Sequence, residues 1–256
     1  MTLAGMISVF LDWVYLIISD MANDWFRFRQ FLIRQDRTAM KVGTDGVLLG
    51  AWAGKGWLLN ILDVGTGTGL IALMMAQRFA GARVDAIEID SESFEQAVEN
   101  VSESPFSERI QVVRSDFLTW EPPHAYNLIV CNPPFFKDSL TSPDPGRTGA
   151  RHEETLPLES LIPKCAKLMT PGGGLALILP VNRLPEVARL ALQSGLHLNR
   201  ILRVRGNPSV AVKRVLIQLD RHFDPVEMGE MTLETGNRGE WSDEYAALTA
   251  AFYLAD

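Results

Sequence analysis

The part of the sequence best suited to chemistry begins with a glycine-rich run, Asp63-Val64-Gly65-Thr66-Gly67-Thr68-Gly69. It follows an apolar run typical of a strand and precedes an amphipathic helix pattern, which is the context that such a motif requires. Glycines let the backbone turn tightly and let a ligand approach the main chain. A dinucleotide fingerprint would need glycine at position 70, which is Leu70. The run therefore favours another small ligand over a dinucleotide, and the alternative is a tight turn without a ligand.

Acidic residues follow the next two strands predicted along the chain. Glu88 and Asp90 end the strand that comes about twenty residues after the glycines, where a carboxylate can accept hydrogen bonds from ribose hydroxyls. Glu88 is the first candidate and Asp90 the second. Asp90 or Ser91 could also cap the helix that follows. Asp116 comes directly after the third predicted strand.

The glycine spacing G-x-G-x-G resembles the cofactor motif of class I methyltransferases. The resemblance implies S-adenosylmethionine (SAM) as the cofactor, with its methionine and ribose lying over the loop. It implies that Asp116 accepts a hydrogen bond from the adenine amine of the cofactor; the alternative for Asp116 is a surface turn. The cofactor-binding residues expected from these motifs are Asp63, Gly65, Gly67, Gly69, Glu88, Asp116 and Asn132.

The fourth predicted strand ends in Asn132-Pro133-Pro134-Phe135, at the sheet edge where ligands of open α/β sheets bind. The Asn132 side-chain oxygen and the Pro133 carbonyl can both accept hydrogen bonds from an adenine N6 amine, which leaves its lone pair free to attack a methyl group. Phe135 offers a flat face on which a flipped base can stack. No strong general base is needed, because the methylated amine loses its proton readily. The alternative is a simple turn that ends a strand.

Asn-Pro-Pro-Phe resembles motif IV of amino-methyltransferases, and residues 36–52 narrow the choice. This stretch, which contains Lys-Val-Gly-Thr-Asp-Gly, is similar to the N-terminal hallmark of the bacterial tRNA(Val) adenine-N6 methyltransferase family. The resemblance runs from about Phe26 to Leu254 and implies methylation of the adenine just 3′ of the anticodon. It also implies that Lys41, Gly43 and Thr44 lie against the methionine end of the cofactor. Thr44 or Asp45 is in addition expected to cap a helix.

Other functions share parts of this pattern. A guanine-N2 rRNA methyltransferase or a release-factor glutamine methyltransferase uses the same Asn-Pro-Pro loop, and only residues 41–52 speak against them. A DNA adenine methyltransferase would be expected to carry an added recognition domain, and none is obvious. A non-catalytic domain that binds a partner would not need the glycine loop, Glu88 and Asn132 together.

Basic residues that could hold RNA occur in three places. Phosphate contacts and stacking suit a single-stranded RNA loop, and the aromatic residues near the first group could instead pack on the core. The first group lies before the glycine motif, the second after Asn-Pro-Pro-Phe and the third near residue 213. They are Arg27, Arg29, Arg34, Arg37 and Lys41, with Trp25, Phe26, Phe28 and Phe31 interleaved; Arg147, Arg151 and His152; and Lys213 and Arg214.

The elements that must position these residues alternate between strands and helices. Such alternation predicts βαβ units and a Rossmann-like α/β fold, with a mostly parallel, seven-stranded sheet and helices on both faces. Residues 138–155 read as a long polar loop. The predicted strands are 58–64, 83–89, 110–114, 126–131, 174–179, 198–203 and 215–220, and the predicted helices are 70–79, 92–101, 156–168 and 185–194.

Length and composition are those of an ordinary globular chain of 256 residues. The net charge of −7 argues against a large basic footprint, although a local basic face can still bind RNA. Two cysteines, Cys131 and Cys165, form no disulfide framework, and no spacing suggests a metal site, so we expect no metal and a cytoplasmic protein.

The first twenty residues differ from the rest of the chain. They are strongly apolar but short, and Asp12 lies in their middle, so they predict neither a spanning helix nor a signal peptide. We interpret residues 1–20 as a dispensable extension; the alternative is a short amphipathic helix that packs on the domain or on a membrane. No stable membrane association is expected. Residues 21–256 then form one methyltransferase domain, with an N-terminal cap of about residues 21–55.

Overall fold

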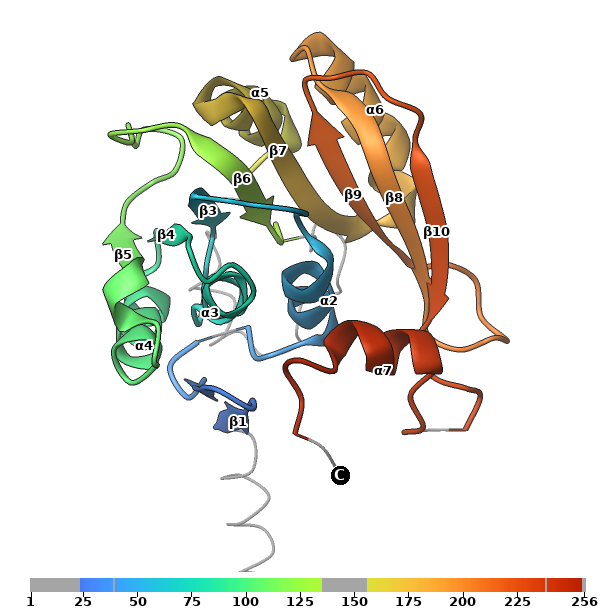
Figure 1. The fold of residues 1–256 in the computed structure, drawn as a ribbon, viewed down its shortest axis with the longest axis horizontal. Helices are drawn as coiled ribbons and strands as arrows, with labels where there is room; N and C mark the ends of the chain where they lie inside the picture. Colours follow the sequence, from blue (N-terminus) through green and yellow to red (C-terminus); the bar gives the residue numbers. More distant parts are fainter. Residues whose placement is uncertain (1–23, 39, 135–155, 238, 255–256) are drawn as a thin grey trace, which may run out of the picture.

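The computed structural model describes residues 24–38, 40–134, 156–237 and 239–254. The expected extension at residues 1–20 and the expected loop at residues 138–155 lie outside these ranges. The described residues contain one large sheet between two layers of helices, with a small hairpin added outside one layer (Figure 1). This is the predicted Rossmann-like α/β architecture.

The large sheet has the strand order β10-β8-β9-β7-β6-β3-β4-β5. Every pairing within it is parallel except the two made by β9, which runs antiparallel to β7 and β8. Its strands are β3 (Asn60–Val64), β4 (Arg83–Glu88), β5 (Ile110–Arg114), β6 (Tyr126–Cys131), β7 (Met169–Pro180), β8 (His197–Arg205), β9 (Arg214–Asp220) and β10 (Glu227–Thr232).

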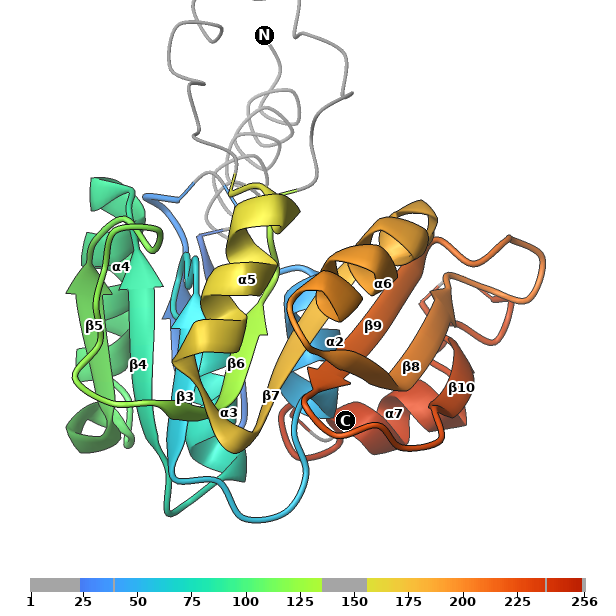
Figure 2. The ribbon, with the colours of Figure 1, turned by 90° about the horizontal axis from the view of Figure 1, so that it is seen from above.

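Helices cover both faces of the sheet, which explains why its central strands are nearly continuous apolar runs. In β6, for example, Leu128 and Val130 belong to one core cluster, whereas Ile129 and Cys131 belong to the other. Figure 2 shows α5 and α6 in front of the sheet and the other helices behind it. The helices are α2 (Thr44–Trp52), α3 (Leu70–Arg78), α4 (Ser91–Ser102), α5 (Leu158–Leu168), α6 (Leu184–Gln193) and α7 (Asp243–Thr249).

The predicted count of seven strands is wrong, because the sheet has eight. The added strand is β10, which pairs with β8 at the edge of the sheet and has the sequence Glu-Met-Gly-Glu-Met-Thr. A mostly exposed edge strand has no need of a continuous apolar run, so its sequence carries little strand signal. Strand β7 also begins earlier than expected, at Met169. Residues 171–173, which precede the predicted strand 174–179, lie inside it, where the pairing with β6 shifts register.

The cap consists of an antiparallel hairpin and the segment that leads into α2. The hairpin strands are β1 (Trp25–Arg27) and β2 (Leu32–Arg34). Its aromatic side chains pack inward, since Phe28 is fully buried and Phe31 is nearly so. The chain's last described residues contact it: the Arg29 amide donates to the Phe252 carbonyl at 2.8 Å, and the Tyr253 ring stacks on Phe28. The cap therefore shares the core of the domain.

Helix α2 is buried on nearly all sides and lies close to α3. Its first residue is Thr44, and its N-cap is Gly43, which makes no side-chain capping bond. The expectation that Thr44 or Asp45 is the N-cap is therefore wrong, because both are already helical. A Cβ on Gly46 would lie 3.1 Å from Leu70, and one on Gly50 would lie 2.5 Å from the Met74 sulfur. These two glycines, one turn apart, let α2 approach α3.

No helix in the described ranges is both long enough and apolar enough to cross a membrane. Both cysteines are buried and unpaired, and Cys131 lies in the core.

We predict that Gly50→Ala destabilises the protein. The new methyl group would overlap the buried Met74 side chain, and overpacking of this kind costs about 1–3 kcal/mol, against a helix-propensity gain of up to about 1 kcal/mol. Urea unfolding should therefore show a net loss of stability that exceeds the loss caused by Gly46→Ala. Introducing Met74→Ala together with Gly50→Ala should relieve the overlap with the Met74 sulfur and Cε and produce a favourable coupling energy between the two changes. Additive effects would contradict this account of the contact.

Candidate functional site

The predicted site residues converge at one edge of the sheet. Strands β6, β3, β4 and β5 are neighbours and parallel, so their carboxyl ends lie at the same edge (Figure 2). The glycine loop leaves β3, Glu88 is the last residue of β4, Asp116 follows β5 and Asn132 follows β6. The structure therefore brings together the four positions that the sequence placed after separate strands.

The glycine loop turns its backbone toward open space. Gly65 and Gly67 adopt left-handed φ angles of 69° and 56°. A Cβ at either position would meet no atom of the described residues within 4 Å. Gly69 differs, since a Cβ there would contact Ala97 of α4. Gly65 and Gly67 can therefore line a ligand, while Gly69 has a packing role between α3 and α4.

Four amide groups of the loop are already hydrogen-bonded inside the protein. The Gly65 and Thr66 amides donate to the Ile87 carbonyl, each at 2.9 Å. The Gly67 amide donates to Glu88 Oε2 at 2.9 Å, and the Gly69 amide donates to the Thr66 carbonyl at 3.0 Å. A phosphate-binding loop instead directs its amides at the ligand. This loop is consequently suited to a ligand whose contact with it is not a phosphate.

Asp63 lies fully buried beneath the loop. Its Oδ2 accepts hydrogen bonds from the Thr66 hydroxyl at 2.6 Å and from the Ala72 amide at 3.0 Å. Its Oδ1 is buried and has no hydrogen-bond partner among the described residues. Burial raises the pKa of this carboxyl to about 7, the two hydrogen bonds oppose the rise, and the nearby Glu88 charge adds to it. Asp63 thus fixes the loop to α3 and keeps one acceptor oxygen unused.

Glu88 holds the loop from the side of β4. It is nearly buried, and besides Gly67 it accepts hydrogen bonds from the amides of Ile89 and Asp90, at 2.9 and 3.0 Å. Asp90, the second candidate from the sequence, is the N-cap of α4 and accepts from the Ser93 amide. The capping alternative for Asp90 is confirmed.

Asp116 shapes the turn that follows β5. It is half-buried; its Oδ1 accepts from the Leu118 amide at 2.8 Å, and its carbonyl accepts from the Trp120 amide at 2.9 Å. The turn expected as the alternative is therefore present, and it places the carboxylate beside the edge where the glycine loop lies.

Asn132 follows β6 directly and is half-buried, and Pro133 is buried. The Asn132 amide makes no hydrogen bond with any residue in the described part of the chain. This side-chain amide lies at the same edge of the sheet as the glycine loop, and no described residue bonds to it. It is therefore suited to bind a substrate. Phe135, predicted as the stacking residue, lies outside the described residues.

The Lys41–Thr44 segment is held by the cap. The buried Gln35 side chain accepts the Val42 amide at 2.7 Å, directly before the α2 N-cap Gly43. Lys41 is exposed and lies 3.8 Å from the Asp24 carboxylate. At the start of α2, Asp45 pairs with Arg214 at 2.8 Å, and Arg214 begins β9 at the same edge of the sheet as the glycine loop. This segment thus begins α2 next to the start of α3.

The candidate RNA-binding residues differ in their surroundings. Arg37 pairs with Glu99, Arg214 pairs with Asp45, and Arg29 donates to the Tyr253 carbonyl. Arg27 and Lys213 are exposed, and their side chains bond to nothing in the described ranges. Arg147 and Arg151 lie outside the described residues. Of the interleaved aromatics, Phe28 and Phe31 pack in the core, whereas Trp25 is half exposed.

Sequence reasoning missed three buried amides that join the cap to the site. They are Gln35, Gln96 and Asn100. The latter two are spaced i, i+4 on α4, next to the apolar Ala97 and Val101. Uncharged polar residues on the apolar side of a predicted helix are a usable signal, because buried polar groups nearly always bond to something specific. Among the described residues, no group of His, Cys, Asp and Glu could hold a metal ion.

Comparison with known proteins agrees with this geometry. The family model described as "Methyltransferase small domain" matches residues 48–184. A protein of Parabacteroides distasonis named tRNA1(Val) (adenine(37)-N6)-methyltransferase is 46% identical over 239 residues, covering 91% of this chain and 99% of that protein. A protein of Tolumonas auensis with the same name is 44% identical over 236 residues, covering 91% and 98%.

Solved structures share the fold. A structure from Agrobacterium tumefaciens described as a predicted O-methyltransferase has a TM-score of 0.64 at 19% identity and covers 81% of this chain and 96% of that one. A methyltransferase from Pyrococcus furiosus has a TM-score of 0.50 at 21% identity, with coverage of 69% and 81%. At these identities the likeness concerns the class I methyltransferase fold alone.

We predict that Asp63 makes stability depend on pH. Its pKa is raised to about 7 in the folded protein, from an ordinary value of 3.8. The folded state therefore holds the proton more tightly, so the contribution of Asp63 to stability is complete below about pH 4 and is lost as pH rises through about 7. The slope is at most about 1.4 kcal/mol per pH unit within that window.

Urea unfolding of the wild type and Asp63→Asn, measured from pH 4 to pH 8.5, tests this linkage. The difference in unfolding free energy should shift in favour of the variant as pH rises toward about 7 and then stay level. A difference that is independent of pH across the range would show that the carboxyl does not titrate there.

Proposed function

This chain belongs to the tRNA1(Val) (adenine(37)-N6)-methyltransferase family, and we propose that it transfers a methyl group from SAM to the N6 amine of the adenine 3′ of the anticodon in tRNA(Val). It is a class I, SAM-dependent methyltransferase. The relatives match along almost their whole length, so the proposal concerns the full catalytic domain and not a shared fragment. We also propose that the reaction takes place in the cytoplasm, where tRNA is found.

The residues at the sheet edge fit SAM. The backbone at Gly65 and Gly67 opens onto free space, and the unused Oδ1 of Asp63 is an acceptor below it. Glu88 and Asp116 are acidic groups at the ends of β4 and β5, suited to the ribose hydroxyls and the adenine amine respectively. Lys41, Gly43 and Thr44 precede and begin α2 and would hold the methionine end. When bound, SAM supplies an electrophilic methyl group on a sulfonium centre.

The proposed chemistry rests on where Asn132 lies and on its side-chain amide having no hydrogen-bond partner among the described residues. It follows β6, the neighbour of β3, and no described residue hydrogen-bonds its amide. Its side-chain oxygen and the Pro133 carbonyl would accept the two N6 hydrogens of the adenine, which weakens conjugation of the nitrogen lone pair with the ring. Pro133 is buried, which fixes its carbonyl. These residues orient the amine for in-line attack, and Phe135 would stack on the base.

The tRNA would approach along the same edge. Arg27 and Lys213 are exposed and have no side-chain partner in the described ranges, so both are open to phosphate, and Trp25 is half exposed near the start of the cap. Arg29, Arg37 and Arg214 would need to exchange a protein partner for phosphate. Arg147 and Arg151 follow Asn-Pro-Pro-Phe and remain candidates from the sequence.

We predict that the purified protein transfers labelled methyl groups from SAM to total tRNA of a strain that lacks this gene. Digestion of the product to nucleosides should yield N6-methyladenosine from one tRNA species. Label in rRNA or in a release factor, with none in tRNA, would agree with the proposed cofactor site but would contradict tRNA as the substrate. This outcome is the alternative because guanine-N2 and glutamine methyltransferases share the Asn-Pro-Pro loop.

We predict that Asn132→Ala lowers kcat by roughly a hundredfold or more, since it removes an acceptor aimed at the reacting amine. Equilibrium binding of SAM should persist, which separates a role in chemistry from a role in folding. Asn127→Ala is the matched control: Asn127 lies at the opposite end of β6, where it accepts the Leu59 and Asn60 amides. That variant should lose stability but keep its turnover. Undiminished methyl transfer by Asn132→Ala would refute the role given to Asn132.

A further inference from the structure

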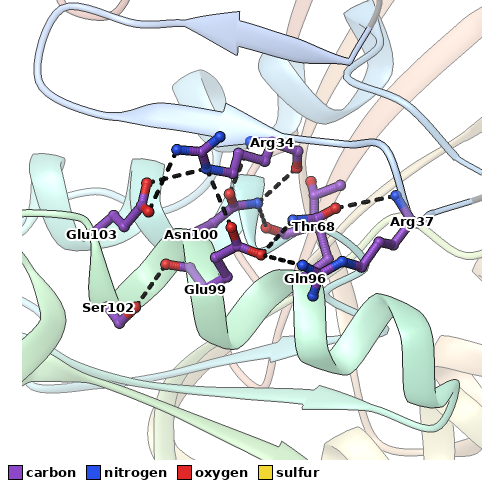
Figure 3. Close-up of polar contacts among 8 residues, drawn as sticks. All are labelled: Arg34, Arg37, Thr68, Gln96, Glu99, Asn100, Ser102 and Glu103. Carbon is purple, nitrogen blue, oxygen red and sulfur yellow. Dashed lines mark hydrogen bonds and ion pairs between the residues drawn. The ribbon is translucent and has the colours of Figure 1, made fainter.

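Helix α4 buries two uncharged amide side chains, Gln96 and Asn100, which are 0% and 1% exposed. They lie one turn apart and face the segment of the cap that follows β2 (Figure 3). Buried amides are retained in a core only where specific hydrogen bonds compensate their desolvation. The partners of each amide therefore indicate what it holds.

Asn100 bonds to two separate parts of the chain at once. Its Oδ1 accepts the Arg34 amide at 2.8 Å, and its Nδ2 donates to the Arg34 carbonyl at 2.9 Å. The second hydrogen of Nδ2 goes to the Thr68 carbonyl of the glycine loop, also at 2.9 Å (Figure 3). Both amide hydrogens are thus used, one on the cap and one on the loop.

The contact at Arg34 continues to the start of α2. The next residue, Gln35, accepts the Val42 amide at 2.7 Å, directly before the N-cap Gly43. A short series of bonds therefore runs from the loop through Asn100 and the end of β2 to the segment that begins α2. Both ends of this series are parts of the proposed cofactor site.

We propose that Asn100 is a positioning residue that fixes the cap to the glycine loop, so that the affinity for SAM depends on this direct link between the two. The proposal rests on the proposed function in one respect, namely that SAM occupies the loop. Asn100 makes no contact with the reacting atoms; it sets the distance between Thr68 and the Arg34–Val42 segment. Its loss should affect cofactor binding more than the chemical step.

Gln96 provides a matched control on the same helix. It is equally buried, and its Oε1 accepts the Arg37 amide at 3.2 Å, so it also holds the cap. Within the described residues its side chain bonds to Arg37 and Glu99, and neither belongs to the glycine loop. A purely structural role for these amides would make Gln96→Ala and Asn100→Ala equivalent in their effect on SAM, whereas coupling to the loop makes them different.

The experiment measures SAM binding by calorimetry for wild type, Asn100→Ala and Gln96→Ala, at a temperature where circular dichroism shows each to be folded. Both variants should have a lower Tm. Asn100→Ala should bind SAM about tenfold more weakly, equivalent to about 1.4 kcal/mol, and Gln96→Ala should bind nearly as the wild type does. In turnover assays Asn100→Ala should raise the KM for SAM with a smaller change in kcat. Equal SAM affinity in all three proteins would overturn the proposal.

A second pair of variants covers the case in which Asn100→Ala does not fold. Gln35→Leu removes the acceptor of the Val42 amide, whereas Gln35→Glu keeps an oxygen at that position. Weaker SAM binding by Gln35→Leu, restored in Gln35→Glu, supports the series of bonds; unchanged binding by Gln35→Leu refutes it. Absence of SAM binding by the wild type would instead count against the proposed function, so the two failures are distinguishable.

Discussion

The site depends on one buried carboxylate. Asp63 accepts hydrogen bonds from the Thr66 hydroxyl and the Ala72 amide, so it joins the end of β3, the glycine loop and the first turn of α3. A loop that must leave its outer surface open to a ligand cannot be held by packing from that side, and it has to be held from below. Burying a carboxyl is costly, and this burial is the largest cause of the raised pKa of Asp63. Glu88 completes the hold from β4 by accepting the Gly67 amide.

The need to hold the loop without covering its outer surface also explains the close packing of the residues that precede it. Helix α2 is apolar on all sides because the sheet, α3 and α7 surround it, and Gly46 and Gly50 let it lie close to α3. The two helices therefore begin side by side at the reactive edge. The Lys-Val-Gly-Thr-Asp-Gly run thus has two physical functions: its last residue, Gly46, allows the close contact with α3, and its first residues lie where a cofactor would be covered.

Much of this arrangement follows from the sequence, and the exceptions are features that the local sequence pattern does not determine. The strands that end in Asp63, Glu88 and Asn132 are central and buried on both faces, so their apolar runs and their order along the chain predict a common edge. Strand β10 was missed because an exposed edge strand does not need such a run. The place of Asn100 on the apolar side of α4 indicates that it is buried, but its partners are backbone groups of Arg34 and Thr68, and contacts with distant backbone segments leave no pattern in the local sequence. The Gly43 N-cap differs from expectation because tertiary contacts, not a capping side chain, hold that helix end.

The acidic composition and an RNA substrate are reconciled by where the cations lie. Arg37 and Arg214 are paired with Glu99 and Asp45, and each of these side chains is partly exposed. Pairs of this kind contribute only about 0–1 kcal/mol, so exchanging a carboxylate for an RNA phosphate costs little. The released carboxylates would then lie near the RNA and repel it, which limits nonspecific binding to any polyanion. An acidic chain can in this way bind one RNA through a few exchangeable cations while its remaining surface disfavours others.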